Sequence, residues 1–106
     1  MNPDEILQKI KQFVCEERNY ILSDHVVKDY VAKDLCSVEE ILYSIETADS
    51  IYAMEEDRRK PKSVDGAKYT IKGVNQFGTP FYTTGKFIET EEGESYFFIT
   101  AHQNKN

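Results

Sequence analysis

Two histidines and a run of basic residues are the side chains in this 106-residue chain that could act chemically on a phosphodiester. Histidine side chains can transfer protons as a general acid or base, and the chain has two, His25 and His102. Lysine and arginine stabilise charge on a phosphate, and tyrosine rings can stack on unpaired bases or assist proton transfer. Attack by an RNA 2′-hydroxyl needs a base, an acid and cationic stabilisation of the phosphorane. These residue types therefore indicate metal-independent RNA cleavage as one chemistry open to the chain.

The basic residues are concentrated in one part of a chain that is acidic overall. The formal net charge is −6, yet residues 58–86 contain seven lysines and arginines and a single acid, Asp65. Attraction between exposed charges acts over roughly a Debye length, about 8–10 Å, so local charge decides what a surface binds. The segregation predicts a cationic surface for an anionic partner. Its members are Arg58, Arg59, Lys60, Lys62, Lys68, Lys72 and Lys86.

Length and composition predict an ordinary globular domain. Hydrophobic residues make up 40% of the chain and charged residues 30%, a balance unlike that of disordered tails. No apolar run approaches the ~20 residues that a membrane span requires, and the first five residues do not resemble a signal peptide, so we expect a cytoplasmic protein without a membrane partner. The spacing of Cys15 and Cys36 fits no metal or redox motif. We expect two buried or half-buried thiols, no metal site and no cofactor.

The first half of the chain has helical signals. Asn2 can cap a helix that has Pro3 at its first position, and apolar residues then recur at helical spacing as far as Val14. A second, shorter helix is expected after Ser23 or Asp24. Residues 37–40, Ser-Val-Glu-Glu, match a capping box, which predicts a third helix that runs to about Thr47.

The second half changes to the period of β-strands. Three runs, Ala67–Val74, Pro80–Ile88 and Ser95–Ala101, are separated by short segments with turn chemistry, and residues 50–54 could form one more strand. Short connections between consecutive strands indicate an antiparallel meander. The predicted fold is therefore α+β, with the N-terminal helices packed on one face of a three- or four-stranded antiparallel sheet.

Strand alternation then predicts a site on the face away from the helices. That face would collect Lys68, Lys72, Tyr82, Lys86, Tyr96 and His102, with Arg58 and Arg59 arriving from the preceding loop. His25 opens the second predicted helix, where Asp24 or Asp29 could orient its ring. The alternative is that lysines and tyrosines simply occupy the solvated side of a half-exposed sheet, which antiparallel sheets commonly have.

Several short motifs resemble those of a family of small bacterial domains of unknown function that is grouped with the RelE, MqsR and BrnT toxins of toxin–antitoxin systems. Members read His-Ala-x-x-Arg in a helix, where this chain has His25 and Lys28, and Ile-Thr-Ala-Tyr in the last strand, where it has Ile-Thr-Ala-His at residues 99–102. The matches also include Ser37, the stretch 56–59, Gly73 and the turn 78–80. The resemblance covers roughly residues 21–102.

The resemblance implies a RelE/MqsR-like domain that cleaves messenger RNA and is held by a cognate antitoxin. The chain would then be one domain over 1–106, with a helical extension (1–19), a toxin-like α+β core (20–102) and a tail (103–106). Together with the alternation argument, it assigns catalysis to His25, His102, Arg58 and Tyr96. Binding of phosphate or RNA is assigned to Lys28, Arg59, Lys68, Lys72, Tyr82 and Lys86.

Three departures from the family pattern favour a different class of function. The motif arginine is absent: Lys28, three residues after His25, is the nearest basic residue and supplies a point charge in place of a bidentate fork. His102 replaces the closing tyrosine, and the chain is acidic where such toxins are basic. A non-catalytic module that keeps the scaffold and binds another protein is the alternative.

Overall fold

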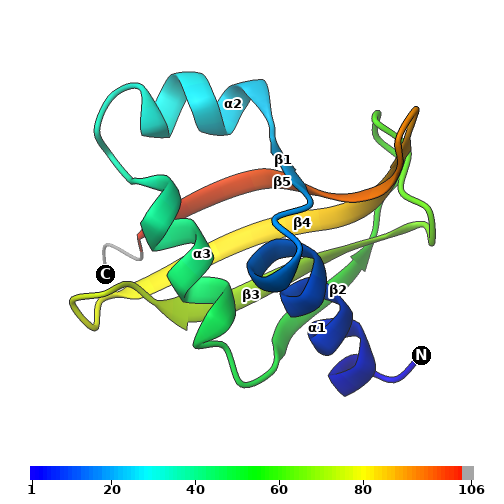
Figure 1. Cartoon of the computed structure of the whole chain (residues 1–106), viewed down its shortest axis with the longest axis horizontal. Helices are drawn as coiled ribbons and strands as arrows, with labels where there is room; N and C mark the ends of the chain where they lie inside the picture. Colours follow the sequence, from blue (N-terminus) through cyan, green and yellow to red (C-terminus); the bar gives the residue numbers. More distant parts are fainter. Residues whose placement is uncertain (104–106) are drawn as a thin grey trace.

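The chain folds into one mixed five-stranded sheet with helices against one of its faces (Figure 1). The computed structural model describes residues 1–103. The strands lie in the spatial order β1-β5-β4-β3-β2. Their bounds are β1 (Tyr20–Leu22), β2 (Ile51–Glu56), β3 (Ala67–Val74), β4 (Pro80–Thr90) and β5 (Gly93–Gln103).

The helices begin where the sequence predicts. Asn2 accepts a hydrogen bond from the Glu5 amide at 2.8 Å and caps α1 (Pro3–Lys11), which continues as the π-helical turn η1 (Gln12–Glu16). Ser23 caps α2 (Asp24–Val26), which continues as η2 (Val27–Val31). The capping box at Ser37 and Glu40 is confirmed and starts α3 (Val38–Glu46). No helix within residues 1–103 is both long and apolar enough to cross a lipid bilayer.

The α+β class and the antiparallel neighbours β3, β4 and β5 are confirmed, but the predicted sheet is wrong in strand number and direction. β2 pairs with β3, and the short β1 runs parallel to β5, with Tyr20 opposite Tyr96. The three residues of β1 are too few to show the alternation of apolar and polar side chains that marks a strand. Only its long-range pairing with β5 makes it a strand, so local pattern could not reveal it.

α1 and α3 cover one face of the sheet (Figure 1). Leu7, Ile10 and Val14 from α1 and η1 are buried in the same apolar cluster as Phe81 and Phe98 from the sheet. The segment expected as an N-terminal extension is therefore part of this core. Cys36 is buried and Cys15 half-buried, both as free thiols, as predicted. Of the predicted tail, Gln103 ends β5, and residues 104–106 lie outside the described part of the chain.

Candidate functional site

The face of the sheet away from α1 and α3 carries polar and aromatic side chains, and we call it the open face. Lys68, Thr70 and Lys72 of β3 alternate with the buried Tyr69 and Ile71. Across the β3–β4 ladder, Thr70 and Thr84 have their hydroxyl oxygens 3.2 Å apart, and Lys72 lies opposite Tyr82. Tyr82 in turn pairs with the exposed His102 of β5. The predicted orientation of Lys68, Lys72, Tyr82 and His102 is therefore confirmed.

Tyr96 does not join them, and its predicted place on the open face is wrong. Thr84 pairs with Thr100 but Gly85 pairs with Phe98, so Ile99 is an extra residue in β5. Such a β-bulge shifts the alternation of side chains by one. Tyr96 is therefore fully buried, with its ring 5.2 Å from that of Phe87.

Replacing Tyr96 by phenylalanine is expected to raise the free energy of unfolding by about 1 kcal/mol, because the buried hydroxyl has no hydrogen-bond partner within residues 1–103. Burial also raises the pKa of this phenol far above its ordinary value, which makes it unsuitable as a proton carrier. Urea unfolding measures the effect. Tyr69→Phe is the matched control and should destabilise the protein, because the Tyr69 hydroxyl donates to Asp65. A destabilised Tyr96→Phe would contradict the prediction.

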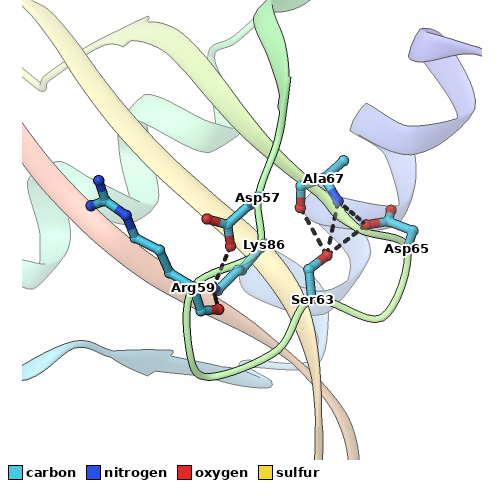
Figure 2. A network of polar contacts seen from close by, with 6 residues as sticks. All are labelled: Asp57, Arg59, Ser63, Asp65, Ala67 and Lys86. Carbon is cyan, nitrogen blue, oxygen red and sulfur yellow. Dashed lines mark hydrogen bonds and ion pairs between the residues drawn. The ribbon is translucent and has the colours of Figure 1, made fainter.

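Lys86 also departs from its predicted role. Its side chain alternates away from the core-facing Gly85 and Phe87, but the loop 57–66 passes over it and leaves the residue 1% exposed. The ammonium donates hydrogen bonds to Asp57 Oδ2 at 2.5 Å and to the carbonyl of Arg59 at 3.0 Å (Figure 2). The expectation that Lys86 binds phosphate is therefore wrong, because its ammonium is buried and paired with Asp57.

A continuous series of five aromatic rings crosses the open face, and we call it the ring row. Tyr52 lies 5.8 Å from Tyr82, and Tyr82 lies 6.2 Å from His102, between ring centroids. His102 stacks at 6.2 Å on Tyr30, which is 5.2 Å from His25. The Lys72 ammonium lies 5.7 Å from the centroid of Tyr82 and adds a cation to the row.

The sequence did not single out Tyr52 and Tyr30 as site residues. Tyr52 falls in a second bulge, between Ile51 and Ala53, and is 65% exposed. Tyr30 belongs to η2, which is held beside β5 because Val26 is fully buried and Ser23 donates a hydrogen bond to the Ile99 carbonyl. Neither bulges nor long-range docking of a helix leave a local sequence signal.

Both imidazoles pack against Tyr30, which lies between them in the ring row: His25 is its last ring and His102 its middle one. Asp29 Oδ2 holds Nδ1 of His25 at 2.7 Å, which settles which of the two predicted aspartates orients it. Nδ1 of His102 lies 3.2 Å from the carbonyl oxygen of Gln103. Among residues 1–103, Nε2 of neither imidazole forms a hydrogen bond. Lys28 is exposed one turn after His25.

No match to this chain is found among protein-family models, curated proteins or solved structures. The relation to the RelE group stays a prediction from short motifs.

The structure does not bring Arg58 and Arg59 to the imidazoles. Both arginines follow Glu56, the last residue of β2, which pairs with Ala67 of β3. His102 of β5 pairs with Tyr82 of β4, and Tyr82 pairs with Lys72 of β3. Ala67 and Lys72 are five residues apart on β3, or about 16 Å at the rise of a β-strand. Half-buried Lys68 lies near the Arg58 end, opposite Glu55. The predicted catalytic group therefore separates into two regions at opposite ends of the sheet.

Proposed function

We propose that the open face binds single-stranded RNA and that His25 and His102 cleave it without a metal ion. The observation that carries the proposal is the pair of imidazoles packed against Tyr30, with Tyr82 beside His102 and Lys72 over the Tyr82 ring. Exposed rings bind unpaired bases by stacking, and neighbouring cations attract the phosphates. A pocket of about 280 Å³ also lies beside Tyr52 and Lys72. It offers room for a ligand at the Tyr52 end of the ring row.

The proposed reaction is an internal transesterification. One imidazole takes the proton of a 2′-hydroxyl through Nε2, and the 2′-oxygen forms a bond to phosphorus. The bond from phosphorus to the 5′-oxygen breaks, and the second imidazole gives its proton to that oxygen. Lys72 offsets the charge on the phosphorane. The products are a 2′,3′-cyclic phosphate and a 5′-hydroxyl, so both proton and leaving group are accounted for.

The proposal changes the predicted catalytic set. Lys72 takes the role expected of Arg58, and Tyr96 has no role because it lies in the core. The resemblance to RelE-group toxins supports a toxin-like activity controlled by a cognate antitoxin, as part of the same proposal. The acidic balance of the chain, −6 overall, makes local contacts on the open face responsible for attracting RNA.

Removing both imidazoles, in His25→Ala/His102→Ala, is expected to lower the rate of RNA cleavage by at least about 100-fold, since each step of general acid or base catalysis contributes roughly 10²- to 10⁴-fold. Tightly controlled induction in a bacterial host, with growth curves and 5′-end mapping of total RNA, gives the first readout. The purified protein and a labelled RNA give the second. Gln8→Ala, on the exposed side of α1, is the control.

Growth arrest with discrete new RNA ends that disappear in the double variant supports the proposal. Cleavage that persists in the purified double variant refutes the assigned chemistry.

Normal growth with intact RNA favours the second candidate, a non-catalytic protein-binding module. A specific feature supports that candidate: β2 is one of the two edge strands of the sheet, and its Tyr52 and Met54 are 65% and 51% exposed. An outer strand of this kind can pair with a strand from a partner.

A further inference from the structure

Residues 57–66 form a basic loop whose exposed cations are Arg58, Arg59, Lys60 and Lys62. Figure 2 shows how one end of the loop is held from beneath. The side chains of Lys86 and Asp57 are 2% and 3% exposed, and Lys86 also bonds the main chain at Arg59. A buried, hydrogen-bonded ion pair thus fixes the main chain directly beneath the arginines.

The other end of the basic loop is fixed by a second network (Figure 2). The Ser63 hydroxyl accepts from the Ala67 amide at 3.1 Å, and its one proton is shared between Asp65 Oδ1 at 2.8 Å and the Ala67 carbonyl at 2.9 Å. Asp65 also accepts a hydrogen bond from the Tyr69 hydroxyl. The Val64 amide donates to the Phe87 carbonyl at 2.8 Å. The loop is therefore held at both ends, by β4 at Arg59 and Val64 and by the start of β3 at Ser63 and Asp65.

The exposed charge of the basic loop is only partly neutralised. Arg58 is paired with Glu56. The carboxylate of Asp65 accepts hydrogen bonds in the second network and does not neutralise a cation of the loop. Arg59, Lys60 and Lys62 form no ion pair with a carboxylate within residues 1–103. Three cations in four residues, on a main chain that does not need to be ordered on binding, favour a ligand with closely repeated negative charges.

We propose that the basic loop anchors the phosphates of a single-stranded RNA at a distance from the imidazoles. This inference rests on the proposed function and names its substrate class: a single strand long enough to reach from the loop to the ring row. The two regions are about 16 Å apart along β3. Lys68 lies near the loop and the paired Thr70 and Thr84 hydroxyls lie on the surface between the ends.

A flexible single strand suits this surface better than a duplex. The ring row offers aromatic faces to unpaired bases, whereas the bases of an A-form duplex are stacked on one another and cannot reach it. The basic loop offers charge without rings, which is suited to the backbone. A strand bound by both regions places the scissile phosphate several nucleotides away from its anchor.

The test measures binding by fluorescence anisotropy in the His25→Ala/His102→Ala background, so that RNA is not cut. Labelled uridine oligomers of three and twelve nucleotides are the probes, at several salt concentrations. Arg59→Ala/Lys62→Ala removes two cations from the loop. Lys11→Ala/Arg18→Ala removes the same residue types elsewhere and is the matched control.

The loop variant is expected to bind the 12-mer at least tenfold more weakly at low salt, with unchanged affinity for the 3-mer. Because a single strand gives a slope of about −0.7 per phosphate contact, the slope of log affinity against log salt should become shallower by about 1.4. The control variant should bind both oligomers like the parent.

Equal affinities of the loop variant and the control for the 12-mer would overturn the anchor, as would the absence of RNA binding. Equal weakening of both oligomers would also overturn it, because the loop would then act at the cleavage site. Polyglutamate that competes as well as RNA would identify a surface for acidic proteins. Loop-dependent binding of the 12-mer by a protein whose histidine-containing form never cuts RNA would keep the anchor and refute the proposed catalysis.

Discussion

Gly73→Ala is expected to lower the free energy of unfolding by about 4 kcal/mol or more, beyond the usual range for a single substitution. α3 crosses β3 at this glycine so closely that an added Cβ would lie 1.9 Å from the carbonyl oxygen of Ser44. Both elements belong to the buried core, which cannot expand locally without loss of packing elsewhere. Urea unfolding followed by circular dichroism measures the change.

Gly85 provides the matched control for this prediction. A Cβ there would lie 2.5 Å from the ring of Tyr96, a side chain that can be shortened. Tyr96→Leu should therefore recover part of the stability lost in Gly85→Ala. Ser44→Ala should recover none in Gly73→Ala, because the contact is with main-chain atoms. Recovery by Ser44→Ala would show that the close approach of α3 is not the cause.

Elements specified by nearby residues were predictable from the sequence. The caps at Asn2, Ser23 and Ser37 are each made by a side chain and an amide three residues away. The predicted strand Ala67–Val74 has the observed bounds of β3, because alternation and turn residues define it locally. Such signals also placed Lys72 and His102 on the open face.

Features that depend on distant pairing were not predictable. The bulge at Ile99 changes which side chains of β5 face the core, and it exists only in the register with β4. Simple alternation therefore placed Tyr96 with His102. Lys86 was assigned to the correct side of its strand, but the covering loop with Asp57 comes from 29 residues away. Charge counted along the sequence cannot show which cations are already paired.

These two errors change the proposed site in a consistent way. Without Tyr96 and Lys86, the proposed chemistry rests on the imidazoles and Lys72 at one end of the sheet. The remaining cations, at the other end, are separated from it by about 16 Å along β3. The single cationic surface predicted from the sequence is thus two separate regions, to which we assign different tasks as a proposal, and the buried Lys86 holds one of them in place.

Lys86→Met is expected to cost about 3–5 kcal/mol of unfolding free energy, the loss typical when one partner of a buried ion pair is removed. Asp57 would be left buried without its cation, and the Arg59 carbonyl would lose its donor. Exposed ion pairs contribute far less, about 0–1 kcal/mol. Lys33→Met, which breaks the exposed pair with Asp29, is therefore the control and should change stability only slightly.

The pH dependence identifies the cause of that loss. The hydrogen bond from Lys86 holds the pKa of Asp57 below its usual value, against the opposing effect of burial. A carboxyl group with a lowered pKa stabilises the fold above its unfolded-state pKa, about 4, and this contribution is lost as the pH falls toward the folded-state pKa. In Lys86→Met, burial without a cation should raise the pKa of Asp57, and protonation then relieves the penalty.

We therefore expect the stability difference between wild type and Lys86→Met to be largest above about pH 6 and to shrink below about pH 4. Urea unfolding at a series of pH values measures it. Lys86→Met/Asp57→Leu should recover most of the stability, because replacing both partners of a buried pair by apolar residues is often neutral. A difference that is independent of pH, or a double variant as unstable as the single, would mean that lost packing and not the unpaired Asp57 carboxylate causes the effect.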